Sequence, residues 1–406
     1  MKEDKTVPQL RFPEFTDAWK QRKLREVVKE FYNGQTPYRQ NKAYWGGNVN
    51  WLASGDLNRG VVTNTIEKIT EEGQKASRLR IIPKGTLVIA IMGLEAAGTR
   101  GNCCILGINT TINQACMALI ANESIATKDF LFQWYKAFGN SLALKFTQGT
   151  KQQNYNEELL GNLDISYPSL KEQQQIGSFF TQLDNTITLQ QRKLNSLQKL
   201  KKGLLQKMFP KNGENIPEIR FPEFSDAWKQ RKFSDVFDEY SEKKHPELPA
   251  LTIIQGKGTI LREDSDRNLL YDKSNLSSYK VVRKDDFIVH LRSFEGGLEK
   301  ANSDGIVSPA YHIFHGDNAD TRFFYPFFRS RYFIDALLKP HVYGIRDGKS
   351  IDIAGMKTIR FLVPSFEEQK RIGKFVENLD NTITLQQRKL ESLQKLKKGL
   401  LQQMFI

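Results

Sequence analysis

The sequence predicts a mixed α/β (α+β) protein: two β-rich globular domains separated by two long helices, which form an antiparallel coiled coil and repeat about a pseudo-twofold axis. Three observations predict this fold class. Two segments occur twice in the 406 residues, the regions between them differ, and one repeated segment carries a helical apolar stripe. The predicted boundaries are 1–167 for the first domain, 168–210 for the first helix, 211–363 for the second domain and 364–406 for the second helix.

The repeated segments lie at two different offsets. Arg11–Lys23 returns as Arg220–Lys232 after 209 residues, with one Thr/Ser change. Leu183–Phe209 returns as Leu379–Phe405 after 196 residues, with two changes. The offsets differ by 13, so the first variable region is 13 residues longer than the second. We therefore expect two unlike surfaces on one repeated frame.

Each long helix is predicted to begin at a capping box, in which a Ser lies three residues before a Glu. The two boxes are Ser169 with Glu172 and Ser365 with Glu368. The helices would run over 170–209 and 366–405, and 40 residues at 1.5 Å each span roughly 60 Å. Pro210 is expected to stop the first helix.

Apolar residues recur along both helices at alternating spacings of three, four and seven, as in a coiled coil. The predicted interface residues are Leu183, Ile187, Leu194, Leu197 and Leu204 in the first helix, and Leu379, Ile383, Leu390, Leu393 and Leu400 in the second. Each stripe could pack on its own domain or on the other helix. The second arrangement is favoured, because both stripes far exceed a usual helix of about 10–14 residues.

The variable regions, about 25–165 and 235–362, read as β-rich with a few helices. The predicted strands are 86–91, 116–120, 286–291 and 359–363, and the predicted helices are 128–138 and 323–338.

Lys and Arg number 60 against 46 Asp and Glu, a net charge of +14 that favours an anionic partner. Nucleic acid is favoured over an anionic membrane surface. The repeat Leu183–Phe209 holds six cations and one anion, and Leu379–Phe405 five cations and two anions, so these helices carry +8 of the +14. No stretch approaches about 18 apolar residues, and no apolar run follows Met1, so we expect neither a membrane span nor a secretory signal, and a cytoplasmic protein.

Catalysis within this chain is not expected, because a duplicated active site should keep its residue types in both halves. All three cysteines (Cys103, Cys104, Cys116) fall in the first half and all five histidines in the second. The cysteines are expected to be buried reduced thiols. No metal site is expected, although His312 and His315 could form one in the second half.

Two further motifs are weak. The run Gly344–Ser350 has the residues of a phosphate-binding loop but spaces its glycines one residue short. Glu368-Gln369-Lys370 has the E-x-K ending of many nucleases, yet it lies in the capped first turn of a helix, where acids are expected.

The variable regions do contain residues that read base edges: Arg and Lys for guanine, and Asn and Gln for adenine. The candidate DNA-binding residues are Arg39, Lys42, Arg100, Thr150, Lys151, Gln152, Gln153, Asn154, Lys257, Arg292, Arg346 and Lys349. Those in the loops 147–156 and 343–350 are the stronger candidates, and the weaker ones are Arg39, Lys42, Arg100, Lys257, Arg262, Arg292 and Lys300. Each of them could equally be an ordinary solvated side chain.

Taken together, these features resemble the specificity subunit of a type I restriction-modification system. The resemblance rests on the duplicated R-F-P-E-F-[TS]-D-A-W-K-Q-R-K segment, the two P-S-x-x-E-Q helix starts at Pro168 and Pro364, the shared L-D-N-T-I-T-L-Q-Q-R-K-L run, and the divergent regions between them. It covers essentially the whole chain.

The resemblance implies a non-catalytic reader of double-stranded DNA, with two target recognition domains for an asymmetric bipartite sequence and helices that act as a ruler. Two methyltransferase subunits would grip the helices and methylate adenine N6 with S-adenosylmethionine. Restriction motor-nuclease subunits would use ATP and Mg²⁺. This chain itself would bind no cofactor. The alternatives are a stand-alone metal-dependent DNA enzyme with one site around His312 and Glu299, and a coiled-coil adaptor that binds only proteins.

Overall fold

The computed structural model describes residues 7–94, 96, 98–147, 154–211, 213–265 and 273–344, together with 349–406. The chain divides into two compact units, and each contains part of both long helices. Unit 1 comprises 1–192 and 388–406, and unit 2 comprises 193–387.

Unit 1 is built mainly on a five-stranded sheet of order β2-β9-β6-β7-β4 and a three-stranded sheet of order β5-β3-β8. Its elements up to the first long helix are β1 (Lys20–Lys23), α1 (Leu24–Val27), β2 (Val28–Asn33), η1 (Lys42–Tyr44), β3 (Trp45–Leu52), η2 (Ser54–Asp56), β4 (Val61–Val62), β5 (Glu67–Ile69), α2 (Glu71–Ala76), β6 (Leu87–Ala90), β7 (Cys103–Leu106), β8 (Thr111–Ile112), β9 (Cys116–Ala121), α3 (Lys128–Thr147), α4 (Glu157–Gly161) and β10 (Asp164–Tyr167). All four residues of β6 are buried, as a central strand covered on both faces requires. The long helices then begin with α5 (Leu170–Lys207).

Among the residues of unit 2 that the structure describes, there is a smaller main sheet of order β12-β19-β16-β17 and four two-stranded sheets. Its elements are β11 (Lys229–Lys232), η3 (Phe233–Asp235), β12 (Asp238–Tyr240), β13 (Leu251–Ile254), β14 (Gly258–Leu261), η4 (Arg262–Asp264), η5 (Lys273–Ser278), β15 (Lys280–Val282), β16 (Phe287–Val289), α6 (Ser293–Gly296), β17 (Glu299–Lys300), β18 (Gly305–Val307), β19 (His312–His315), α7 (Thr321–Phe328), η6 (Tyr332–Leu338), η7 (Lys339–His341), β20 (Val342–Tyr343), β21 (Ser350–Ile351), α8 (Ile353–Lys357), β22 (Arg360–Val363) and α9 (Phe366–Met404). Its core is rich in phenylalanine, with Phe233, Phe314 and Phe328 fully buried.

The repeated sequence forms the same local structure in both units. The Lys-Gln-Arg-Lys run is β1 in unit 1, which pairs antiparallel with β10, and β11 in unit 2, which pairs antiparallel with β22. In each unit, this pairing leads the chain directly into a long helix.

The long helices begin where the sequence predicts, at Leu170 and Phe366, and they end one or two residues earlier than expected. Ser169 Oγ accepts the backbone N–H of Glu172 at 3.4 Å, and Ser365 accepts that of Glu368 at 3.4 Å. The capping box also predicts that each Glu carboxylate accepts the backbone N–H of the N-cap Ser, and this prediction is wrong. Each carboxylate instead binds an arginine, Arg11 or Arg220, through two hydrogen bonds of 2.7 Å.

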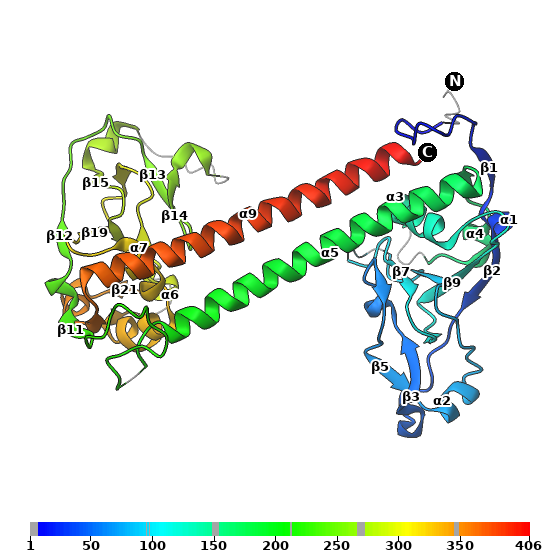
Figure 1. The fold of residues 1–406 in the computed structure, drawn as a ribbon, viewed down its shortest axis with the longest axis horizontal. Coiled ribbons are helices and arrows are strands. Elements are labelled where there is room, and N and C mark those ends of the chain that lie inside the picture. The colour runs from blue at the N-terminus through cyan, green and yellow to red at the C-terminus, as the bar shows by residue number, and fades with distance from the viewer. Residues whose placement is uncertain are drawn as a thin grey trace. The chain divides into compact units, whose positions relative to one another are not determined.

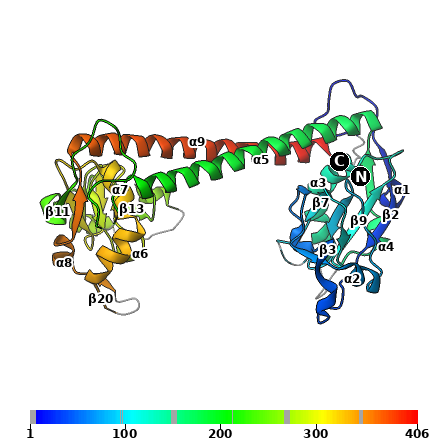
Figure 2. The same ribbon diagram turned by 60° about the horizontal axis from the view of Figure 1, so that its bottom comes forward.

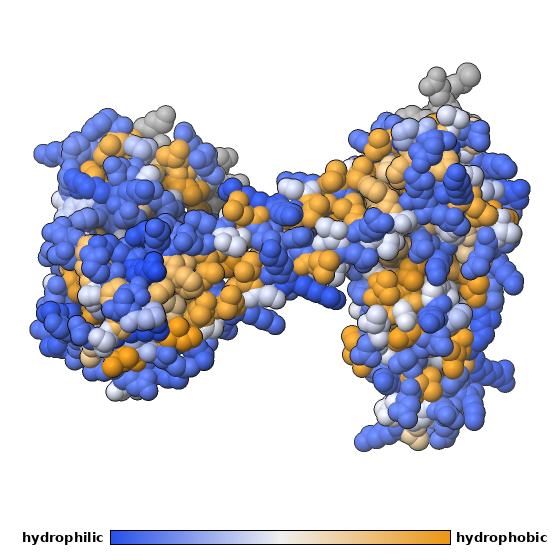
Figure 3. Space-filling model, viewed as in Figure 1, coloured by the Kyte–Doolittle hydropathy of each residue, from blue (hydrophilic) through white to orange (hydrophobic). Residues whose placement is uncertain are grey.

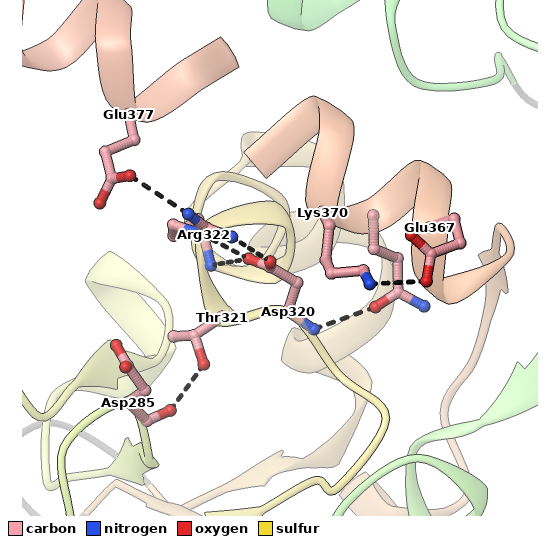
Figure 4. A network of polar contacts seen from close by, with 8 residues as sticks. Asp285, Asp320, Thr321, Arg322, Glu367, Lys370 and Glu377 are labelled. Carbon is pink, nitrogen blue, oxygen red and sulfur yellow. Dashed lines mark hydrogen bonds and ion pairs between the residues drawn. The ribbon is translucent and has the colours of Figure 1, made fainter. Parts of the chain in front are cut away.

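The Gln that follows each of these glutamates ties the long helix to the start of a domain helix. Gln173 Oε1 accepts the N–H of Thr127, just before α3. Gln369 Oε1 accepts the N–H of Asp320, the N-cap of α7, and Asp320 also binds Arg322 (Figure 4). Both Gln side chains are buried, so the Glu-Gln pair serves as a structural joint.

Within each unit, the segments of α5 and α9 run antiparallel. In unit 1 the ring of Phe180 lies 6.1 Å from that of Phe405, and Asp184 pairs with Lys397. Residue numbers therefore fall along α9 as they rise along α5, as in an antiparallel pair (Figure 1). In unit 2, Lys201 pairs with Asp380 at 2.5 Å. The two ion pairs are repeats of each other, because Asp380 and Lys397 follow Asp184 and Lys201 by the same 196 residues.

Two predicted helices differ from the structure. Helix α3 continues nine residues past the predicted end at 138. The single helix predicted over 323–338 is instead α7 followed by a π-helical segment, η6. Ser330 lies at the break, and its hydroxyl accepts the N–H of Phe333 at 3.1 Å, so a side chain competes with the regular backbone ladder.

The predicted strands agree with β6, β9, β16 and β22 to within two residues at each end. None of the described helices has the length and apolar character that crossing a bilayer requires.

Candidate nucleic-acid interface

Three of the predicted residues of unit 2 come together around α6, which follows the end of β16. Arg292 lies at the N-cap of α6, and Lys349 Nζ lies 5.6 Å from the ring centre of Phe294 in the same helix. Lys257 belongs to the turn between β13 and β14, and this turn abuts α6, because a β-carbon on Gly296 would overlap the amide of Gln255. Lys257, Arg292 and Lys349 are all exposed. Figure 2 shows α6 and β20 at the same end of unit 2.

His290 occupies the link between β16 and α6. Its Nδ1 accepts the backbone N–H of Arg292 at 3.3 Å. Burial, with the nearby charges of Arg329 and Arg292, lowers the pKa of His290 to about 4. The ring is therefore neutral near pH 7, and it supports the chain that carries Arg292.

In unit 1, Arg100 and Asn154 lie on segments that meet at the corresponding end of the main sheet. Arg100 belongs to the loop that follows β6, and its carbonyl accepts a hydrogen bond of 2.6 Å from the Arg59 guanidinium. The N–H of Tyr155, next to the exposed Asn154, bonds to the carbonyl of Ile91 at 2.9 Å, where that loop begins. The candidate Arg100 thus follows β6 in unit 1, as the candidate Arg292 follows β16 in unit 2.

Arg39 and Lys42 lie apart from this group, beside the three-stranded sheet of unit 1. The Arg39 guanidinium makes two hydrogen bonds to Glu67 and lies 3.9 Å from the ring centre of Trp45. The bond to Glu67 raises the pKa of Arg39. Lys42 begins η1 and is exposed. Arg39 would have to exchange a carboxylate for a phosphate in order to bind DNA.

The remaining candidates have mixed placements. Thr150, Lys151, Gln152, Gln153 and Arg346 lie outside the described residues. The weaker candidate Arg262 donates to the hydroxyl of Tyr279 at 3.2 Å, and Lys300 lies 5.5 Å from the ring centre of Tyr325. Both of these cations contact their own domain.

The predicted helix-interface residues are buried or half-buried. Leu194 and Leu390 are each 3% exposed. Leu183 and Leu400 pack against the core of unit 1, and Leu204 packs against that of unit 2. The others, Ile187, Leu197, Leu379, Ile383 and Leu393, are half-buried. In each unit the stripes therefore pack on the domain core as well as beside the other helix, so both of the arrangements considered from the sequence contribute.

The groups considered for metal or acid-base chemistry have structural partners. His312 Nδ1 bonds to Glu239 at 2.6 Å, whereas His315 Nδ1 bonds to Asp286 at 2.7 Å, because residues three apart on a strand face opposite sides. Glu299 is fully buried in an ion pair with Arg329. Over the described ranges, no cluster of three or more His, Cys, Asp or Glu side chains could hold a metal.

The three cysteines are buried and free of disulfides, as predicted. Burial raises the pKa of Cys103 to about 12, so its thiol stays protonated at neutral pH.

Two features of the site were missed by the sequence reasoning. Gln255 lies beside Lys257 but was not chosen, and Glu299 was considered only as a metal ligand. Gln255 carries the same signal as the glutamines that were chosen, because it is a base-reading residue type in a glycine-bearing segment. No sequence signal marks Glu299, because its contacts come from segments about 40 residues earlier and 30 residues later.

Comparisons with known proteins agree with this architecture. The chain matches the family described as "Type I restriction modification DNA specificity domain" over residues 16–199 and again over 225–395. It is 24% identical over 306 residues to the type I restriction enzyme MjaIX specificity subunit of Methanocaldococcus jannaschii, covering 71% of this chain but only 65% of that protein. It is 22% identical to the putative MjaX specificity subunit of the same organism, covering 96% of this chain and 93% of the relative.

A solved structure shows the same fold. The crystal structure of the type I restriction-modification S subunit from M. genitalium superposes with a TM-score of 0.59 at 14% identity, covering 98% of this chain and 99% of that one. The family match spans both halves and most of the sequence. The chain therefore belongs to the type I restriction-modification DNA specificity family.

Proposed function

We propose that this chain is the non-catalytic DNA-recognition subunit of a type I restriction-modification complex, in which each half reads one part of an asymmetric bipartite DNA target. The main support for this proposal is that both units share the same repeated strand pair and helix start but carry different loops. The Arg–Glu pair at the helix start is the same in both units, whereas Arg100 and Asn154 lie at the sheet end in unit 1 and Arg292 in unit 2. Unlike side chains on a common frame favour unlike half-sites.

The helices are proposed to set the spacing of the half-sites and to bind two methyltransferase subunits. Leu189 is 61% exposed and its repeat Leu385 is 64% exposed, while Leu200 and Leu396 are 51% and 53% exposed. Apolar patches interrupt the hydrophilic surface of α5 and α9 (Figure 3). Exposed apolar residues in two identical settings favour two copies of one partner.

The chemistry would belong to the partners. The methyltransferase subunits would transfer a methyl group from S-adenosylmethionine to adenine N6, and the restriction subunits would cleave unmodified DNA with ATP and Mg²⁺. This chain would bind no cofactor, and it would act in the cytoplasm on the DNA of the cell. The neutral His290 and the ion-paired Glu299 are consistent with a structural rather than a catalytic use of these groups.

A domain exchange tests this function. Replacing residues 28–165 with the corresponding region of another specificity subunit should change one half of the methylated sequence and leave the other half and the spacing unchanged. Methylated adenines are mapped in DNA modified by the assembled complex. If both halves change together, the two-reader proposal is wrong.

A coiled-coil adaptor that binds only proteins is the remaining rival. If the chain were such an adaptor, it would contribute nothing to the affinity of the assembled complex for DNA. Sequence-selective binding that weakens as salt rises, and that follows the exchanged domain, would exclude the adaptor.

A further inference from the structure

We propose that the turn between β13 and β14, residues 255–258, is a preformed DNA-contacting element of unit 2, and that Glu299 is the positioning residue that holds it. This inference rests on the proposed function and names a recognition element within it. The expected ligand is one half-site of double-stranded DNA.

The turn exposes two side chains suited to DNA. Gln255 and Lys257 are both exposed, and neither side chain makes a hydrogen bond or ion pair with the described part of the chain. A glutamine amide can pair with an adenine edge, and a lysine can bind guanine or a phosphate. The backbone around them is tight, with φ of 83° at Gly256, between the two residues, and 78° at Gly258, after Lys257.

A buried carboxylate fixes the shape of this exposed turn. Glu299 Oε1 accepts the N–H of Gly256 at 2.7 Å, and Oε2 accepts that of Gly258 at 3.1 Å. Arg329 forms an ion pair with Glu299, and the Tyr325 hydroxyl donates to Glu299 at 2.7 Å. Burial, with the nearby Glu299 charge, raises the pKa of Tyr325, so its hydroxyl remains a donor.

A second side chain holds the turn at Lys257. Asn302 Nδ2 donates to the carbonyls of Lys257 at 2.7 Å and Thr259 at 2.8 Å. Surface turns usually satisfy their backbone groups with water. Here, the buried Glu299 carboxylate and the exposed Asn302 amide fix the backbone before any ligand arrives, which lowers the entropy cost of binding.

The turn shares its surface with the candidates around α6. Gln255 lies against Gly296, and the N-cap of α6 is Arg292. Lys257, Arg292 and Lys349 give this surface three cations, and Glu295 is an exposed acid on the same short helix. The surface is therefore mainly basic and carries one uncommitted amide, which suits a DNA groove.

The test uses the complete complex with its methyltransferase subunits. Gln255→Ala and Lys257→Ala should each weaken binding to the target duplex, Lys257→Ala by about tenfold. Gln255→Ala should also relax base preference at positions within one half-site. Lys284→Ala is the matched control. Lys284 is an exposed lysine before β16, whereas the proposed surface around α6 follows that strand. The Lys284→Ala complex should therefore bind DNA as the unaltered complex does.

Glu299→Gln keeps the size of the side chain and removes its charge. It should relax base preference in the same half-site as Gln255→Ala and leave the other half-site unchanged. A merely structural role would lower the unfolding temperature without a preference change confined to one half. If Glu299→Gln prevents folding, Gln255→Ala and Lys257→Ala still show whether the turn contacts DNA.

The failures of the two proposals are distinguishable. If the unaltered complex does not prefer any sequence, the proposed function itself is wrong. If it prefers both half-sites but Gln255→Ala and Lys257→Ala behave like Lys284→Ala, only the recognition turn is overturned.

Discussion

The guanidinium of Arg11 donates two hydrogen bonds of 2.7 Å to the carboxylate of Glu172, which lies 161 residues later in the sequence. The side chain of Glu172 is only 1% exposed, so this arginine replaces the water that would otherwise solvate the carboxylate. The pair joins the segment that opens unit 1 to the first turn of α5. Arg220 and Glu368 repeat it in unit 2.

Removing this arginine should destabilise one unit. Arg11→Ala leaves a buried carboxylate unpaired, which costs about 3 kcal/mol of the free energy of unfolding. Urea unfolding of the full chain measures the loss, and Arg11→Ala/Glu172→Gln should recover part of it, because the buried charge is gone. A loss below about 1 kcal/mol would show that the pair behaves like a surface salt bridge.

The stability of unit 1 should depend on pH through Lys397. Burial, together with the charge of Lys136, lowers the pKa of Lys397 to about 8, although Asp184 opposes the change. In the unfolded chain the pKa is near 10.4. Between these values the unfolded state holds the proton and the folded state does not, so the free energy of unfolding gains a contribution that rises with pH from about 8 to 10.

Lys397→Met should remove that rise, whereas Lys389→Met, at an exposed position of the same helix, should keep it. Urea unfolding at a series of pH values from about 7 to 10 makes the comparison. If the free energies of unfolding of Lys397→Met and the unaltered chain differ by the same amount at every pH, Lys397 does not cause the pH dependence.

The exposed leucines should govern partner binding. Leu189→Glu or Leu385→Glu alone should leave one methyltransferase subunit in the complex, and the double variant should leave none, because a charge at an apolar contact is costly. Mass measurement of the purified complexes counts the subunits. Asn64→Glu, exposed in unit 1, is the control for added charge. Retention of two subunits by the double variant would place the docking surface elsewhere.

Matched insertions should lengthen the spacer of the target. Seven residues added after both Leu194 and Leu390 keep the heptad phase and preserve the Asp184–Lys397 and Lys201–Asp380 pairs, since each pair lies within one unit. The helices grow by about 10 Å, equivalent to about three base pairs. The same insertion in α5 alone should abolish assembly. An unchanged spacer in the doubly extended protein would show that the helices are not a ruler.

The repeats made the frame predictable, because one segment seen twice fixes both helix starts and the strands that precede them. The loops were less predictable. Lys257, Arg292 and Lys349 were chosen by residue type, and their meeting at α6 depends on contacts among three distant segments. Glu172 was expected to cap its own helix, but its carboxylate binds the half-buried Arg11 instead, because a bidentate pair of charge-assisted hydrogen bonds is stronger than one bond from a backbone N–H.

We propose that the two units carry different DNA-reading loops on one repeated frame. Mapping N6-methyladenine in DNA from a host that carries the complete system tests it most directly. We expect methylation within one asymmetric motif, made of two unlike parts at a constant separation. A palindromic motif, or a single continuous one, would contradict it.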